Sequence, residues 1–87
     1  MKLGYTVQIW QEGEHYIAHA LPLDVASSGP TPAKARAALK EAVHLFLHTA
    51  KEEATLEQIL EESGYVHGAR GWTSPKWVKT EKATVAA

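Results

Sequence analysis

The chain has 87 residues and no cysteine, and its nine Lys and Arg residues nearly balance ten Asp and Glu residues. This length predicts one domain, residues 1–87, with a thin core, because chains of this size bury only about 60–65% of their unfolded surface. Without cysteine, the core gains no help from disulfides or from a Cys-based zinc site. The sequence pI near 6.5 also lacks the basic footprint, above about pI 9, that is typical of nucleic-acid-binding domains.

No apolar run in the sequence approaches the roughly 20 residues that cross a membrane. Residues 1–5 lack the apolar stretch of a signal peptide, so we expect a cytoplasmic location. A thin core also gives such a small domain a reason to seek cover from a partner or a second copy.

Two alternating segments open the chain, at residues 5–10 and 15–20, and each predicts a strand. Gly13 can adopt positive φ at little cost, so we expect a hairpin with a two-residue loop at Glu12 and Gly13. This register pairs Ile9 with Tyr16, and it predicts a core face formed by Tyr5, Val7, Ile9, Tyr16, Ala18 and Ala20. The opposite face is mixed, with Trp10, His15, Ile17 and His19 among its members.

A short third strand is expected at residues 25–28, after Pro22 interrupts the second strand. Thr31 and Pro32 then predict the start of a helix that runs to about Glu53, because Thr can cap free N–H groups and Pro fits the first helical turn.

A second, shorter helix is predicted from the capping box that begins at Thr55 and ends in Gln58, with Gly64 as its C-terminal cap. Residues 79–85 alternate loosely and are interpreted as a final strand. The order strand, strand, strand, helix, helix, strand predicts an α+β fold. We expect a small antiparallel sheet of three or four strands with one long and one short helix packed on one face.

The long helix has an apolar arc wider than one sheet face needs, because Ala38 and Leu45 extend it on one side. Either the second helix covers the extra width, or a second subunit or a partner does. Trp72 and Trp77 are large apolar residues in a polar stretch. We assign Ala38, Leu45, Trp72 and Trp77 to an interface between copies of the chain, as a homodimer or a higher oligomer.

Candidate chemistry is sparse. His44 and His48 have the i,i+4 spacing of a metal site, but both are predicted on the solvent side of the helix, without the Glu of an H-E-x-x-H motif. Ser27 and Ser28 precede a glycine without a G-x-S-x-G elbow, and Asp24 is the single aspartate. We predict no enzyme activity, catalytic residue, metal or cofactor. The alternative is a nuclease-like enzyme that uses Asp24.

Basic and aromatic residues interleave near the C-terminus, a pattern that occurs in single-stranded nucleic-acid binding: Arg70, Trp72, Lys76, Trp77 and Lys79. We favour a core or interface role for the tryptophans over a nucleic-acid contact.

Three segments together resemble the HicB family of antitoxins. They are residues 16–29 (YIAHALPLDVASSG), residues 40–47 (KEAVHLFL) and residues 55–65 (TLEQILEESGY), with Thr31 and Ala35 between the first two. The resemblance covers residues 3–65. The chain departs from the family pattern at Leu21, where proline is common, and at residues 28–30 (SGP).

The resemblance implies a partial ribonuclease H-like fold without the catalytic carboxylates, and a role in a toxin–antitoxin system. The implied partner is a small HicA-type toxin that cleaves mRNA with a catalytic histidine and is neutralised by steric masking. Many relatives add a C-terminal DNA-binding module, which this chain lacks, so direct DNA binding is not expected. The alternative is an orphan homo-oligomer without a toxin partner.

The mixed sheet face is the expected contact surface for this partner, because aromatic residues such as Trp10 are favoured interface anchors. The adjoining strand edge from Val25 to Ser28 is expected to take part. The predicted partner-binding residues are therefore Trp10, His15, Ile17, His19, Val25, Ser27 and Ser28.

Overall fold

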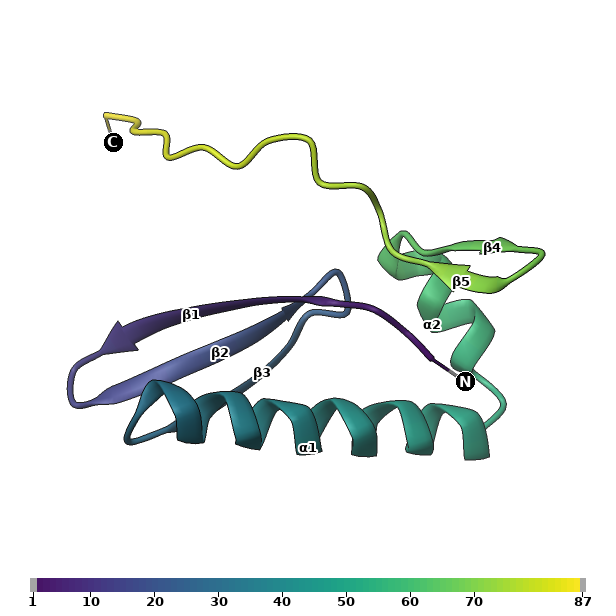
Figure 1. Cartoon of the computed structure of the whole chain (residues 1–87), viewed down its shortest axis with the longest axis horizontal. Helices are drawn as coiled ribbons and strands as arrows, with labels where there is room; N and C mark the ends of the chain where they lie inside the picture. The colour runs from purple at the N-terminus through teal and green to yellow at the C-terminus, as the bar shows by residue number, and fades with distance from the viewer. Residues whose placement is uncertain (1, 87) are drawn as a thin grey trace.

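A three-stranded antiparallel sheet and one long helix form the main body of the protein. The computed structural model, which describes residues 2–86, has an α+β fold (Figure 1). Its elements are β1 (Thr6–Glu12), β2 (His15–Leu21), β3 (Val25–Gly29), α1 (Pro32–Glu52), α2 (Leu56–Ser63), β4 (Val66–Gly68) and β5 (Gly71–Thr73). The sheet order is β1-β2-β3, with both neighbouring pairs antiparallel. The predicted fold class and element order are confirmed.

The β1–β2 hairpin corrects the predicted register by two residues. Glu12 pairs with His15, so the two-residue loop is Gly13-Glu14, and Ile9 faces Ala18 rather than Tyr16. Gly13 has φ of 60° at the first loop position, where a type II′ turn requires a positive value. Because the side-chain period of a strand is two, the shift leaves every residue on its predicted face.

The helix α1 lies along one face of the sheet, which we call the inner face (Figure 1). The small residues Ala18 and Ala20 are fully buried there and allow a close approach of the helix. Gly29 brings β3 so near to α1 that a Cβ atom on it would lie 2.7 Å from the backbone nitrogen of Ala35. The core cluster comprises Ala18, Ala20, Leu23, Ala35, Leu39, Val43, Leu60 and Tyr65.

Both helices begin and end near the predicted residues. The Thr31 side chain caps α1 by accepting a hydrogen bond from the Lys34 backbone N–H at 3.1 Å. Gly64 ends α2 in the left-handed conformation with φ of 100°, as predicted. The predicted capping box of α2 is wrong, because the Thr55 hydroxyl donates backwards to the Ala50 carbonyl instead of capping α2.

The C-terminal region differs from the prediction. Residues 79–85 form no strand, and residues 74–86 have no regular secondary structure. The last strands are β4 and β5, which pair as a separate two-stranded sheet across a turn at Ala69 and Arg70. The alternation in residues 79–85 is carried by charged side chains, so a strand there has little apolar surface to bury.

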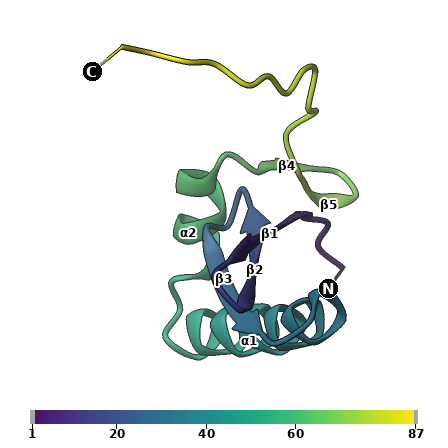
Figure 2. The ribbon, with the colours of Figure 1, turned by 90° about the vertical axis from the view of Figure 1, so that its left-hand side faces the viewer.

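The short helix α2 contacts α1 and β4 and so connects the main body to the hairpin (Figure 2). The buried Tyr65 follows α2, and its hydroxyl donates a 2.6 Å hydrogen bond to the Gly4 carbonyl near the start of the chain. Burial, with a smaller effect of the nearby Tyr5, raises the pKa of Tyr65 above its ordinary value. Among residues 2–86, no helix combines the length and apolarity needed to cross a membrane.

Candidate functional site

The sheet presents its second face, which we call the outer face, on the side away from α1. The two ribbon views agree that α1 lies on one side of the sheet and the C-terminal segment, residues 74–86, on the other (Figures 1 and 2). The pairing register assigns to the outer face the side chains of Thr6, Gln8, Trp10, Glu12, His15, Ile17, His19, Leu21, Ala26 and Ser28. This face is therefore a mixture of apolar and polar groups, as predicted.

Trp10 on the edge strand β1 and His19 on the central strand β2 are neighbours on the outer face. The Trp10 indole is 42% exposed and meets the His19 ring edge to face, with 6.0 Å between the ring centroids. His19 Nε2 lies 2.6 Å from Asp24 Oδ1 in the β2–β3 loop. Asp24 therefore restrains the same imidazole ring that Trp10 contacts.

Five of the seven predicted partner-binding residues lie together on the outer face: Trp10, His15, Ile17, His19 and Ser28. Val25 and Ser27 do not, since they pair with Ala20 and Ala18 and point toward α1. The prediction took the whole edge of the third strand as one surface, whereas alternate side chains of a strand point to opposite faces. Only the backbone of Val25 and Ser27 lies at the sheet edge.

The predicted interface between copies falls on three separate parts of the molecule. Ala38 and Leu45 lie on α1. Trp72 on β5 stacks on His67, with 4.5 Å between ring centroids, and packs against the core. Trp77 instead lines a hollow of about 160 Å³ on the outer face, with Thr6, Gln8, Leu21 and Thr80. These four residues do not form one continuous surface.

A second hollow, which we call the groove, lies between α1, α2 and β3. It has a volume of about 510 Å³, and its apolar lining consists of Val25, Ala42, Leu45, Phe46, Ala50 and Ile59. The helix α2 thus covers part of the wide apolar arc of α1, as one of the two predicted alternatives requires. Leu45 remains 57% exposed, so the arc is not fully covered. The groove was missed in the sequence because it forms between elements rather than within one.

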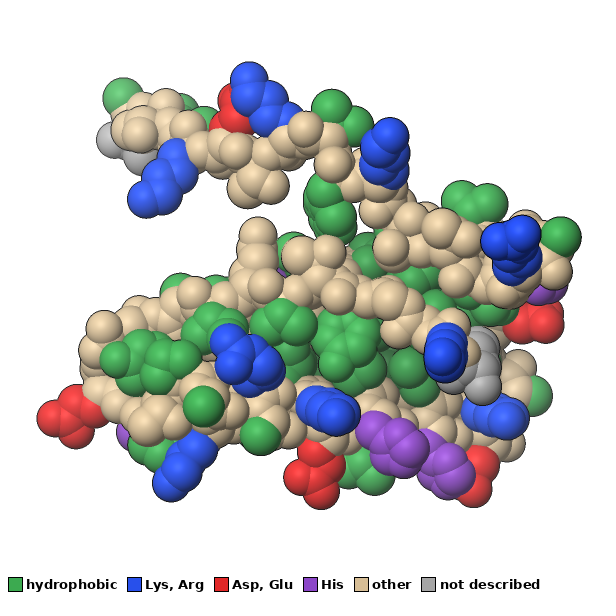
Figure 3. Space-filling model, in the orientation of Figure 1, with side chains coloured by type: hydrophobic (Ala, Val, Ile, Leu, Met, Phe, Trp, Pro, Cys, Tyr) green, Lys and Arg blue, Asp and Glu red, His purple; other side chains and the backbone are tan. Residues whose placement is uncertain are grey.

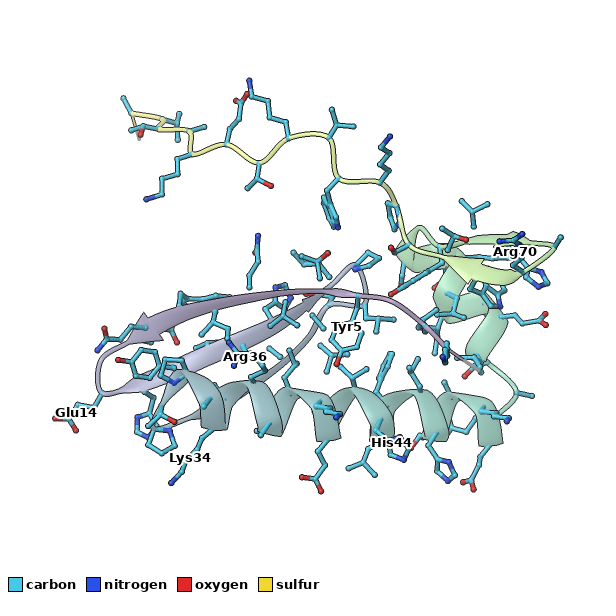
Figure 4. All side chains as sticks on the ribbon, in the orientation of Figure 1. Tyr5, Glu14, Lys34, Arg36, His44 and Arg70 are labelled. Carbon is cyan, nitrogen blue, oxygen red and sulfur yellow. The ribbon has the colours of Figure 1, made fainter. Side chains whose placement is uncertain are left out.

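The remaining titratable side chains lie mostly in solvent. His44 points away from the sheet (Figure 4), and His48 contacts Glu52 at 3.2 Å, which agrees with the predicted solvent side of α1. Within residues 2–86, no group of three or more His, Asp and Glu side chains is arranged to hold a metal ion. The side-chain partner of Asp24 is His19 rather than a second carboxylate.

The outer face and the groove are therefore the two candidate binding surfaces of the described residues. Both carry apolar side chains that the domain itself leaves exposed, Trp10 on one and Leu45 on the other. Comparison with known proteins adds no relative: no protein-family model, no curated protein and no solved structure matches this chain.

Proposed function

We propose that this chain is a HicB-like antitoxin domain that binds a small mRNA-cleaving toxin of the HicA type and neutralises it by steric masking. The observation that carries the proposal is the outer face, which presents an exposed tryptophan, Trp10, and has no helix over it (Figure 1). On this proposal the domain acts in the cytoplasm, where mRNA is translated, and breaks no covalent bond.

The chemistry of the outer face supports protein binding. A solvated face of an antiparallel sheet is ordinarily polar, yet the Trp10 indole and the half-buried Ile17 lie side by side here on paired positions. Tryptophan is enriched among the residues that dominate interface energies. A standard interface takes about 800 Å² from each partner, roughly 12% of the 6786 Å² that this domain exposes.

Acidic side chains lie at both ends of the same face. Glu12 lies opposite His15 at one end, Glu14 lies in the adjoining hairpin loop (Figure 4), and the exposed Asp24 lies in the loop at the other end. An enzyme that binds RNA needs a basic surface for the phosphate backbone. Acidic groups at the ends of a partly apolar face complement such a surface and exclude RNA from it.

One of the three segments that resemble HicB antitoxins builds part of this surface, and the other two lie on α1 and α2. Residues 16–29 form almost all of β2, the following loop and β3, and they contain both members of the His19–Asp24 contact. Residues 55–65 form α2 and end at the buried Tyr65. The proposal therefore unites a sequence resemblance with a surface chemistry that was derived separately.

The proposal is tested by co-expression with the small protein encoded in the adjacent reading frame. We expect that protein to arrest growth alone, to be neutralised by the wild-type chain, and to co-purify with it. Trp10→Ala combined with Ile17→Asp should abolish both effects, because the change removes the apolar anchor and places a charge beside it. Leu45→Lys is the matched control on the opposite side of the sheet and should still neutralise. If the outer-face double variant binds as tightly as wild type, the proposed surface is wrong.

A further inference from the structure

We infer that the groove between α1, α2 and β3 receives the C-terminal segment, residues 74–86, of a second copy of this chain. The inference goes beyond the proposed antitoxin function and does not depend on it. Within one chain, the exposed Leu45 and the exposed Trp77 lie on different surfaces. The inference places them on opposite sides of one contact between two chains.

The groove offers apolar surface that the chain itself does not cover. Its volume of about 510 Å³ lies in the range of about 300–1,000 Å³ that is typical of pockets for medium-sized ligands. Leu45 is 57% exposed at its wall, and Phe46 is half-buried within it. The free energy of the system falls when another apolar group covers such side chains and displaces water from them.

The C-terminal segment carries apolar side chains that its own chain leaves half-exposed or almost fully exposed. Trp77 is 50% exposed, Val78 90% and Val85 84%, and no regular secondary structure holds the segment. An extended segment of this kind can follow an open groove and bury these side chains while its lysines stay in water. Tryptophan is the residue best suited to anchor it.

Charge identifies a second copy as the occupant. Residues 66–87 carry four basic residues and one acidic residue, whereas residues 1–65 carry five basic and nine acidic residues. The sequence spaces Lys76, Lys79 and Lys82 along the C-terminal segment. Figure 3 shows blue basic side chains distributed along this segment. Glu53 lines the groove, and the groove-lining helix α2 carries three further glutamates. The basic segment and the predominantly acidic residues 1–65, which include Glu53 at the groove, attract each other between copies.

The segment of the same chain does not occupy its own groove. The segment lies on the outer side of the sheet, away from α1 (Figures 1 and 2). Trp77 lines a hollow there with Gln8 and Leu21, whereas the groove is lined by α1, α2 and β3. When two copies exchange segments, each fills the groove of the other, and the contact closes with two-fold symmetry. The expected product is a dimer rather than a filament.

The test is sedimentation equilibrium of the full-length wild-type chain and of three full-length variants. Wild type should form a dimer at concentrations below about 1 mM. Leu45→Lys should weaken the dimer at least tenfold by placing a cation against the lysines of the segment. Trp77→Asp with Val78→Asp should do the same from the other side. Val66→Lys changes another exposed apolar residue, 66% exposed against 57% for Leu45, outside both surfaces and should leave the dimer intact.

Mixing gives the sharpest result. The Leu45→Lys chain keeps a functional segment and the Trp77→Asp, Val78→Asp chain keeps a functional groove, so the mixture should associate although neither variant does alone. Added salt should weaken the wild-type dimer, because the charges are exposed. Circular dichroism establishes that each variant is folded, and Leu45→Gln and Trp77→Ser replace any variant that is not.

Three outcomes would overturn the inference. The wild-type chain could remain monomeric up to about 1 mM. Both groove and segment variants could dimerise like wild type, in which case the contact lies elsewhere. Finally, a monomeric wild type that binds a polyuridine oligonucleotide, with loss of binding in Trp77→Ser, would assign the basic segment to single-stranded nucleic acid instead.

Discussion

Gly29 is the point at which the sheet and the long helix come closest, and replacing it by alanine tests the packing directly. The added Cβ would lie 2.7 Å from the Ala35 nitrogen and 2.9 Å from the Lys34 carbonyl carbon. Both are backbone atoms, so no side chain can rotate away. The same Ala35 nitrogen donates the first backbone hydrogen bond of α1, to the Thr31 carbonyl at 2.9 Å. The substitution must therefore displace β3 or the first turn of α1.

The expected cost follows from known effects of inserting one methyl group into a tightly packed interior, about 1–3 kcal/mol. Gly→Ala also reduces the conformational entropy of the unfolded chain, which stabilises the folded state by about 0.4–1 kcal/mol. Gly4→Ala provides a matched control for that second effect, because its Cβ would have no atom within 4 Å and its φ is not positive. The difference between the two variants isolates the steric cost at Gly29.

The assay is thermal and urea unfolding of both variants, followed by circular dichroism. For a domain of this size, about 1–3 kcal/mol corresponds to a melting temperature roughly 4–24 °C lower for Gly29→Ala than for Gly4→Ala. If the two variants unfold within about 0.5 kcal/mol of each other, the close approach of β3 and α1 is not a constraint on the fold, and the reasoning fails.

Three further changes test other parts of the structure. Tyr65→Phe removes the hydrogen bond to the Gly4 carbonyl and should lower the free energy of unfolding by about 1 kcal/mol near neutral pH. Because burial raises the pKa of Tyr65 in the folded state, wild-type stability should also fall as the pH rises above about 10, and this part of the fall should be absent from Tyr65→Phe. Thr31→Ala removes the side-chain acceptor for the Lys34 N–H and should cost about 1 kcal/mol in urea unfolding. Ala54 has a φ of 58°, so Ala54→Gly should relieve left-handed strain and raise the free energy of unfolding by about 0.5–1 kcal/mol.

Each of these expectations has its own control. The sign for Tyr65 follows because the unfolded chain loses its phenolic proton at lower pH than the folded chain, so rising pH favours unfolding. A parallel pH dependence in wild type and Tyr65→Phe would show that other groups cause the fall. Thr80→Ala alters a threonine in the C-terminal segment, outside any helix, and should leave stability unchanged. A loss of stability in Ala54→Gly would contradict the strain at that position.

Local signals in the sequence were sufficient for the helices and for the two faces of the sheet. Thr31 and Pro32 determine where α1 begins, and Gly64 determines where α2 ends. The hairpin register escaped prediction because a shift of two residues keeps every side chain on the same face. Both loops contain Gly13, and only the position of its positive φ within the turn separates them.

Features that form between segments distant in the chain could not be predicted from local sequence patterns. The groove depends on how α2 turns back against α1, and the hydrogen bond from Tyr65 to Gly4 joins residues from the two ends of the domain. Val25 and Ser27 were grouped with Ser28 as one strand edge because the third strand, unlike the first two, has no clear apolar alternation. Trp77 has no periodic neighbours at all, so no pattern indicated that it lies over the outer face.

The hydrogen bond between Tyr65 and Gly4 also has a consequence for biosynthesis. The ribosome synthesises β1 first. The Tyr65 hydroxyl, which holds the Gly4 carbonyl just before β1, is added only after α2 has been synthesised. Contacts between residues so far apart form late, because the intervening chain must first lose its freedom. A chain truncated before Tyr65 should therefore hold the residues that precede β1 loosely and be open to protease attack near the N-terminus.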